Sequence, residues 1–431
     1  MKGIAYNVAA LIIEKFVVTI ILMTSNIVVI RYLGAKDFGE LALFQVYLAL
    51  ATVVTEFGVR RVYTSQKSIK SEKIIFREVV FVKYIIAALF FSLFILFLFS
   101  FNINKNYILI AIIFVVSPWE AYSYHFEANL KNDLLVKLRV TVTLSLALIR
   151  IYLCYIKADI TLLMLSFVLN YVLTNFICIV IAKRNNFNYV ALNKKTNRRK
   201  VRKYILSRSF FFWVSVLAVQ LNMRTDQLML SALAGTASVG IYAGAYKLVE
   251  QLMSIPSILA NVLLPHISRN VQSNKEKYLL EVYKISMLAS LPICIILLFI
   301  APLLLPLLLG REFIDSVPIF QILISALPIL VIVNVSGLYY SIFKLEKYAV
   351  YRNVFGLCLS LVLNYVFIKY FGAIGAAISV FISYTLLAYL FEWLLPLTRK
   401  NAHLKLQALV SVFNIKTYQE IFAYALQKIK K

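Results

Sequence analysis

Long apolar runs, separated by short polar stretches, set the pattern of this chain. The runs are apolar all round and do not alternate between polar and apolar positions. About 20 such residues let a helix cross a hydrocarbon core of about 30 Å, whereas the strands of a membrane barrel alternate over about 10 residues. The pattern therefore predicts an all-α polytopic membrane protein.

We predict twelve membrane-spanning segments. The first is too long for a cleaved signal peptide, so we expect it to remain as a span. The segments are residues 8–30, 40–58, 79–101, 107–127, 135–156, 160–182, 206–231, 238–263, 284–309, 318–343, 350–371 and 373–395.

Composition and charge agree with this class. Of the 431 residues, 62% are hydrophobic and 15% charged, against about 45–50% and about 25% in soluble domains. If the N-terminus is cytoplasmic, 35 of the 45 Lys and Arg fall on the cytoplasmic side and six on the other. This positive-inside bias predicts that both termini are cytoplasmic. It explains the net charge of +26 without a nucleic-acid partner, because basic loops meet anionic membrane lipids.

A glycine motif occurs twice. Gly34–Gly39 joins the first two segments and Gly235–Gly240 joins the seventh and eighth, each with four residues between its glycines. Together with the topology, this spacing predicts two six-helix bundles related as parallel repeats, a transporter architecture with the substrate path between the halves. Neither motif continues with Lys-Ser/Thr, so neither is a phosphate-binding loop.

The predicted domains follow from the repeat. They are an N-terminal lobe at 1–190, a basic cytoplasmic linker at 191–205, a C-terminal lobe at 206–397 and a basic tail at 398–431. The apolar residues of the tail between Tyr418 and Ile429 share one helical face. This favours an amphipathic helix on the cytoplasmic membrane surface, and a frayed basic tail fits the sequence equally well.

Charged residues inside the spans are the candidate functional groups. A charge at the bilayer centre costs at least about 2.5–3.5 kcal/mol, so it usually faces the protein interior or a wet cavity. Arg224 and Asp226 lie in the seventh segment, and Lys247 and Glu250 lie three residues apart on one face of the eighth. We interpret these four as a polar path through the membrane, with charge pairs that only hold helices together as the alternative.

Three further charges are candidates. Glu14 and Lys15 in the first segment point about 100° apart, so at least one is expected to face inward, unless both extend toward the cytoplasmic surface. Arg150, near the outer end of the fifth segment, either lines the path or extends outward.

Other charges lie near segment ends and are interpreted as interfacial. Glu56 with Arg60 and Arg61 resembles a pair at a helix end, and Glu120 and Glu127 lie toward the inner end of the fourth segment.

Three stretches of the chain are distinctive: Arg31–Gly39 (RYLGAKDFG), Thr225–Lys247 with its TDQLML and VGIYAGAYK ends, and Leu363–Ala377 (LNYVFIKYFGAIGAA). They resemble stretches of polysaccharide flippases of the Wzx type, O-antigen and capsule exporters included. The first stretch opens such chains, the second is typical of their second half, and the third resembles the join of their eleventh and twelfth helices.

This resemblance implies a member of the multidrug/oligosaccharidyl-lipid/polysaccharide exporter superfamily in a bacterial plasma (inner) membrane. Such a flippase moves an undecaprenyl-diphosphate-linked oligosaccharide to the outer leaflet by alternating access, and a polysaccharide polymerase is a possible partner. By analogy, Lys15, Arg224 and Lys247 meet the diphosphate or acidic sugars. Glu14, Asp226 or Glu250 are the candidates for coupling to H⁺ or Na⁺.

Three alternatives remain. The first is a multidrug or cation antiporter of the same superfamily. Such a pump should prefer an acidic cavity for cationic drugs, and the deep Lys and Arg residues of this chain argue against it. A membrane glycosyltransferase or polymerase usually has a large outer loop, and every predicted outer loop is short. A peptidoglycan-precursor flippase commonly carries additional helices. The sequence has no hydrolase motif and no metal-spaced set, so we expect no enzyme activity, catalytic residue, metal or cofactor.

Overall fold

In the computed structural model the described residues are almost entirely helical and contain no strand. These residues are 2–66, 72–101, 105–129, 132–184, 198–267 and 275–412. Within them, the side chains of 2–17, 65–66, 72–75, 101, 132, 253–267, 346 and 412 are not described.

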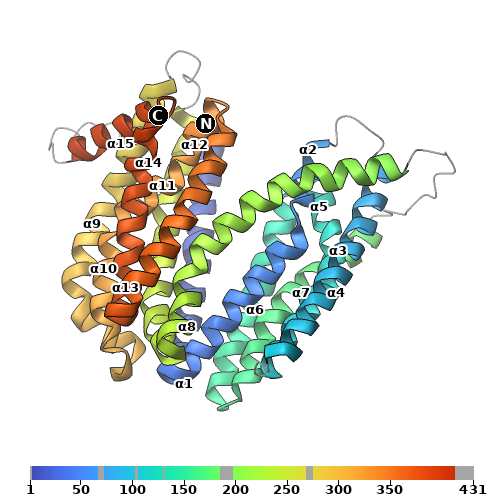
Figure 1. Cartoon of the computed structure of the whole chain (residues 1–431), viewed down its shortest axis with the longest axis horizontal. Coiled ribbons are helices and arrows are strands. Elements are labelled where there is room, and N and C mark those ends of the chain that lie inside the picture. Colours follow the sequence, from blue (N-terminus) through green and yellow to red (C-terminus); the bar gives the residue numbers. More distant parts are fainter. Residues whose placement is uncertain are drawn as a thin grey trace. The chain divides into compact units, whose positions relative to one another are not determined.

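Figure 1 shows the elements in chain order. They are α1 (Lys2–Glu56), α2 (Val59–Gln66), α3 (Glu72–Phe101), the 3₁₀ turn η1 (Lys105–Ile110), α4 (Ala111–Val116), the 3₁₀ turn η2 (Ser117–Trp119), α5 (Glu120–Ala128), α6 (Asn132–Tyr155), α7 (Ile160–Arg184), α8 (Arg198–Ile267), α9 (Lys275–Leu309), the 3₁₀ turn η4 (Arg311–Phe313), α10 (Ser316–Ser325), α11 (Leu327–Val335), α12 (Gly337–Ile342), α13 (Glu346–Ala388), α14 (Leu390–Leu394) and α15 (Arg399–Val412).

The multi-pass, all-helical architecture predicted from the apolar runs is confirmed. Over the described ranges, seven helices are long and apolar enough to cross a membrane, or eight if the bent pair Ser316–Ser325 and Leu327–Ile342 forms one span. Three of the seven, Val18–Glu56, Arg198–Leu252 and Lys347–Leu394, contain a glycine break. Each of these three covers two predicted segments, and the total of twelve stays a prediction.

The first glycine of each repeated motif breaks a long helix. Gly34 has φ 68° and ψ −179° within α1, and Gly235 has φ 83° and ψ 172° within α8. Only glycine adopts this region of backbone space readily, because a side chain would collide with the neighbouring peptide groups. The two motifs thus share a backbone conformation as well as a spacing, as expected for a repeat.

The second glycines allow the two motifs to pack directly against each other. A methyl group on Gly240 would lie 1.8 Å from the carbonyl oxygen of Ala35, and one on Gly39 would lie 2.0 Å from that of Thr236. Such distances are far inside van der Waals contact, so any side chain at either position forces the backbones apart. Small residues at a membrane helix crossing serve the same purpose of close backbone approach.

The chain divides into two compact units, each described here by itself. Unit 1 comprises Met1–Met23, Gly34–Gly39 and Thr225–Lys431, and unit 2 comprises Thr24–Leu33 and Glu40–Arg224. Unit 2 therefore holds most of the predicted N-terminal lobe, while both copies of the glycine motif belong to unit 1.

Each unit is a bundle of packed helices. In unit 1, α9, α10, α11 and α13 lie side by side, drawn in yellow to orange in Figure 1. In unit 2, α6 packs along α7, and α3 packs against α4 and the η2 turn.

Residues after the last span include a helix that is part of the bundle. Helix α15 packs along α9 and buries Ala402, Leu404, Lys405 and Ala408. The start of the predicted basic tail is therefore anchored within unit 1. The predicted amphipathic face from Tyr418 onward lies outside the described residues.

Candidate functional site

The break at Gly235 brings two segments of α8 together around Asp226. The Asp226 carboxylate is only 3% exposed, and it accepts a hydrogen bond from the hydroxyl of Tyr242, which is fully buried on the second segment. The backbone N–H of Gln227 donates to the same carboxylate at 2.9 Å. A buried carboxylate requires such donors, because leaving it unpaired in a dry environment is strongly unfavourable.

The second segment of α8 continues with aromatic and charged groups one turn further on. Tyr242 and Tyr246 stack with ring centroids 5.8 Å apart. Lys247 and Glu250 form an ion pair at 3.6 Å, with side chains 20% and 32% exposed. The predicted pairing of these two charges is confirmed, and both remain accessible from outside the packed interior.

Two further predicted site residues, Arg224 and Arg150, belong to unit 2. Arg224 is partly buried and ends unit 2, immediately before Thr225 begins unit 1. Arg150, in unit 2, is 3% exposed and does not extend outward: its guanidinium lies 4.2 Å from the ring centroid of Phe167. The Nε atom of Arg150 is buried with no hydrogen-bond partner among the described residues. The side chains of Glu14 and Lys15 lie outside the described residues.

Unit 2 contains a buried charge cluster that the sequence pattern did not predict. The Lys83 ammonium is fully buried and donates to Glu120 at 2.7 Å and to the carbonyl of Thr55 at 2.9 Å. Tyr124 donates to the same Glu120 oxygen at 2.7 Å. Glu120 was interpreted as interfacial, and Lys83 lies within the predicted segment 79–101. The one available signal was Lys83 itself, which interrupts the apolar run of α3.

The expected pair at the end of α1 is also corrected. Arg60 pairs with Glu127 through two hydrogen bonds of 2.7 and 2.8 Å, and Arg139 adds a contact of 3.2 Å to the same carboxylate. Glu127 belongs to α5, so Arg60 pairs with a residue of another helix and not with its sequence neighbour Glu56.

A second buried cluster joins α13, α14 and α15 in unit 1. Glu392 is fully buried and accepts from Lys405 at 2.8 Å and from Tyr340 at 3.1 Å, while Arg352 lies 3.8 Å away. Lys405 also donates to the carbonyl of Ala388 at 3.2 Å, near the end of α13. Burial lowers the pKa of Lys405 to about 8, although the neighbouring Glu392 acts in the opposite direction.

We expect Lys405→Met to lower the thermal midpoint of the purified protein by about 5 °C. Removing one partner of a buried pair costs about 3–5 kcal/mol when nothing compensates, and a loss of 1 kcal/mol lowers the midpoint by about 2–4 °C. Here Tyr340 and Arg352 remain beside Glu392, so we expect a loss of about 2 kcal/mol. Lys400→Met is the matched control, because Lys400 lies on the same helix as Lys405 but pairs at the surface. Its partner is Glu276 of α9, and the two side chains are 60% and 39% exposed. Equal shifts in the two variants would contradict an anchoring role for Lys405.

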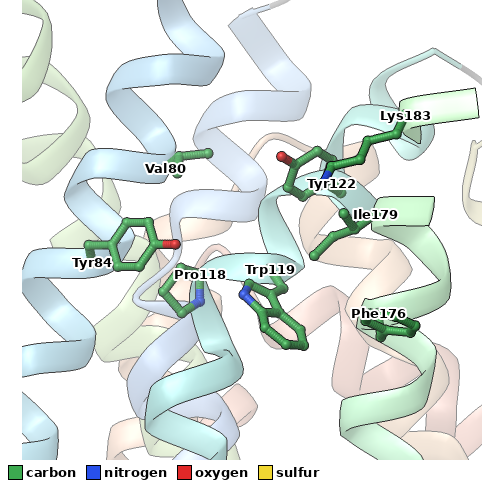
Figure 2. A pocket seen from close by; sticks show the side chains of 8 residues that line it. All are labelled: Val80, Tyr84, Pro118, Trp119, Tyr122, Phe176, Ile179 and Lys183. Carbon is green, nitrogen blue, oxygen red and sulfur yellow. The ribbon is translucent and has the colours of Figure 1, made fainter. Parts of the chain in front are cut away.

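A pocket of about 310 Å³ lies within unit 2 (Figure 2). Half of the residues that line it are aromatic, and Lys183 is the one charged group among them. Such a pocket can hold an apolar or aromatic group beside a cation. None of the predicted site residues lines it; the aromatic residues are Tyr84, Trp119, Tyr122 and Phe176.

Several solved transporter structures share this fold. The lipid II flippase MurJ in an inward closed conformation gives a TM-score of 0.69 at 14% sequence identity, over 93% of this chain and 91% of that chain. An inward-facing multidrug resistance MATE family transporter of the MOP superfamily gives 0.61 at 12% identity, over 94% and 99%. A MOP superfamily transporter from Pyrococcus furiosus gives 0.54 at 13% identity, over 94% and 96%. Identities this low establish a common fold and no more.

Sequence similarity identifies the family. The chain matches no curated protein. The family model for polysaccharide biosynthesis proteins matches residues 4–271, which is more than half of the chain. The fold agrees with this match, since the chain has the multi-pass helical architecture of MOP superfamily transporters and flippases. We conclude that this chain belongs to the polysaccharide biosynthesis protein family.

Proposed function

We propose that this protein is a flippase that moves an undecaprenyl-diphosphate-linked oligosaccharide repeat unit from the cytoplasmic to the outer leaflet by alternating access. The observation that carries the proposal is the pair Lys247–Glu250, which remains partly exposed within a membrane-spanning segment of α8. Charged groups in a span are retained where they meet water or a charged substrate. Family membership favours a substrate of polysaccharide biosynthesis.

The charges on α8 suit a diphosphate substrate. A diphosphate does not cross hydrocarbon unaided, because removing an ion from water without a partner is prohibitive. Lys247 and Arg224 supply cations that bind phosphate oxygens, while the lipid chain stays in the bilayer. The stacked Tyr242 and Tyr246 rings lie next to Lys247. In this proposal Asp226 and Glu250 balance the cations or carry a coupling H⁺ or Na⁺, and Lys15, Glu14 and Arg150 are further members of the path.

The proposed setting is a bacterial plasma membrane with both termini in the cytoplasm. The strongly asymmetric distribution of Lys and Arg along the chain supports this orientation. The completed repeat unit, an O-antigen, capsule or other surface glycan, would pass to a polysaccharide polymerase after export.

Deletion of the gene, followed by extraction of lipid-linked intermediates, tests the function. We expect complete repeat units to accumulate on the cytoplasmic leaflet, because synthesis continues while export stops. Re-expression of the intact chain should restore surface glycan, and re-expression of an unrelated membrane protein is the control.

Other outcomes of the same experiment point to other functions. Truncated glycans on the lipid carrier would contradict the proposal in favour of a glycosyltransferase. Accumulation of peptidoglycan precursor would indicate lipid II as the substrate. Normal intermediates together with increased sensitivity to cationic drugs would favour the antiporter.

A further inference from the structure

The pocket drawn in Figure 2 lies near one end of three helical segments that are long enough to span a membrane. Lys183 is next to Arg184, at which α7 ends, and Phe176 lies eight residues before that end. On α3, Tyr84 lies eight residues after Phe76, at which the span begins. At a rise of about 1.5 Å per residue, the pocket therefore extends about 12 Å from the ends of the spans. This depth covers the headgroup layer of a bilayer, about 5–7 Å on each side, and the adjoining hydrocarbon.

A break between α4 and α5 accompanies the hollow. The 3₁₀ turn η2 separates these helices, and its residues Pro118 and Trp119 line the pocket. Proline lacks an N–H group and prevents the usual hydrogen bond to the carbonyl four residues earlier, here that of Phe114. The Ser117 hydroxyl donates to this carbonyl at 3.0 Å, so the break leaves no unpaired oxygen there.

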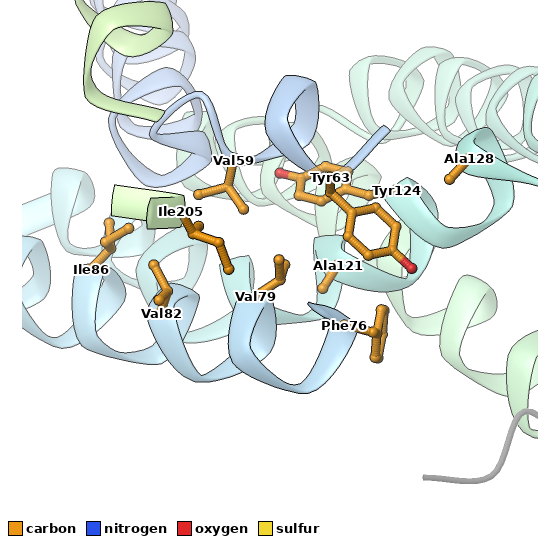
Figure 3. Close-up of a cluster of buried hydrophobic side chains, with 10 residues drawn as sticks. All are labelled: Val59, Tyr63, Phe76, Val79, Val82, Ile86, Ala121, Tyr124, Ala128 and Ile205. Carbon is orange, nitrogen blue, oxygen red and sulfur yellow. The ribbon is translucent and has the colours of Figure 1, made fainter. Parts of the chain in front are cut away.

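Packing behind the pocket holds its walls in place. Figure 3 shows a cluster of buried apolar side chains from α2, α3, α5 and α8. Val80 and Tyr122 line the pocket and also pack against this cluster. The ring centroids of Trp119 and Phe176 lie 6.2 Å apart, which joins η2 to α7. A pocket with such supported walls is formed before a ligand enters, so binding costs little ordering.

The end of the pocket nearest the membrane surface is positively charged. Lys183 lines the pocket and is exposed, and Arg77 is exposed on α3, three residues before Val80 and hence on the same helix face. The described acidic side chains of α3 and α5 already have basic partners, which are Lys83 for Glu120, Arg202 for Glu78 and Arg60 for Glu127. The sequence contains no Asp or Glu from 160 to 225, so α7 adds no negative charge.

This combination suits a phospholipid with a negatively charged headgroup. Basic pockets between helices near the membrane surface bind the phosphates of anionic lipids. Below the cation, Trp119 and Tyr84 offer amphipathic rings at the depth where a lipid headgroup joins its acyl chains. A zwitterionic headgroup carries its own ammonium group, which competes with Lys183 for the phosphate. A free phosphate ion would leave the aromatic wall uncovered.

We propose that the pocket of unit 2 binds one anionic phospholipid from the leaflet at which α7 ends. Lys183 binds the lipid phosphate, and Trp119 and Phe176 contact the first part of an acyl chain. A lipid in this position touches α3, α5 and α7 together and stabilises their packing. The site is separate from the charged residues of α8 and does not depend on the function proposed above.

Quenching of Trp119 fluorescence in vesicles tests the proposal. The chain has three tryptophans, so Trp213→Phe combined with Trp393→Phe leaves Trp119 as the only one. The protein is placed in phosphatidylcholine vesicles in which about one tenth of the lipid is brominated near the start of its acyl chain. Brominated phosphatidylglycerol should quench at least about twofold more than brominated phosphatidylcholine, because the site retains the anionic lipid. Equal quenching by the two lipids would overturn the proposal.

Neighbouring variants separate a site from general attraction to a basic surface. Lys183→Gln should weaken the preference for phosphatidylglycerol about tenfold, since a charged group donating to phosphate is lost. Arg184→Gln is the matched control: Arg184 is equally an exposed cation but does not line the pocket, and its side chain points about 100° away. It should keep the preference, and equal losses in the two variants would overturn the site. Ile179→Phe fills part of the pocket without changing charge and should also reduce the preference.

Thermal unfolding in detergent gives a second measurement on the unmodified chain. Phosphatidylglycerol should raise the midpoint by about 4 °C, phosphatidylcholine by less than about 1 °C, and Lys183→Gln should lose the difference. Inorganic phosphate should not reproduce the rise; if it does, the site takes a free anion and the lipid proposal fails. Complete displacement of phosphatidylglycerol by an equal fraction of undecaprenyl phosphate would assign the pocket to the carrier lipid of export and would equally contradict it.

Discussion

Gly240→Ala is expected to lower the thermal midpoint by about 10 °C or to prevent folding. The added methyl group would lie 1.8 Å from the Ala35 carbonyl oxygen, and that oxygen belongs to backbone that cannot turn away. Relief requires the two glycine motifs to move apart along their length, at a cost of about 4 kcal/mol. At about 2–4 °C for each kcal/mol, this corresponds to the expected shift.

A matched glycine variant shows whether the effect comes from the close approach. A methyl group on Gly337 would meet nothing within 4 Å, and this glycine lies in a helix. Gly337→Ala should therefore change stability by at most about 1 kcal/mol, through helix propensity alone. Similar midpoints for the two variants would mean that the motifs do not pack as described. Thermal unfolding in one detergent, followed by loss of monodisperse protein, is the measurement for both.

Lys247→Ala is expected to reduce export of the lipid-linked oligosaccharide by about tenfold or more, with normal insertion in the membrane. A hydrogen bond from a charged group to a charged ligand is worth about 1.5–3 kcal/mol, and each 1.4 kcal/mol is a factor of ten in binding. Arg224→Ala should act in the same direction for the same reason. Lys247→Arg keeps the charge and should retain more export than Lys247→Ala.

The chain offers a close control for the Lys247 variant. Lys284 pairs with Glu281 at 3.3 Å, with side chains 20% and 34% exposed, which closely resembles the geometry of Lys247 with Glu250. If broken ion pairs alone explained a loss, Lys284→Ala would reduce export as much as Lys247→Ala. Wild-type export in both Lys247→Ala and Arg224→Ala would remove these residues from the proposed path.

The glycine motifs and the charges of α8 lie on one continuous element. Gly235 breaks the helix, Asp226 precedes the break, and Lys247 follows it. The hydrogen bond from Tyr242 to Asp226 joins the two sides of the break. Replacing Gly240 is therefore expected to disturb both the packing of the motifs and the orientation of the charged segment, whereas replacing Lys247 removes a single group.

Helical spans, membrane class and the glycine breaks were accessible from the pattern of residues. Apolar runs of membrane length specify helices locally, because each backbone group must find its partner within the same segment. The spacing of Gly34 and Gly235 indicated two equivalent turns for a similar reason: the conformation at each break depends mainly on that one residue. The pairing of Lys247 with Glu250 was likewise predictable, since residues three apart share a helix face.

The sequence pattern did not predict contacts between helices. Glu120 was interpreted as interfacial, yet it meets Lys83 at 2.7 Å in a buried site although 37 positions separate the two residues. Arg60 paired with Glu127 on another helix instead of with Glu56 nearby. The start of the basic tail became a packed helix because Lys405 reaches Glu392.

Hydropathy and residue spacing describe one helix at a time, so they indicate which stretches are apolar enough to span a membrane and where each can bend. Which face of a helix meets which neighbour depends on how whole side-chain surfaces fit together. Buried charges depend on that fit most strongly, because each must find an opposite charge or a polar donor once water is excluded. The partners of Lys83, Asp226 and Glu392 were therefore determined by how each bundle packs and not by the local sequence.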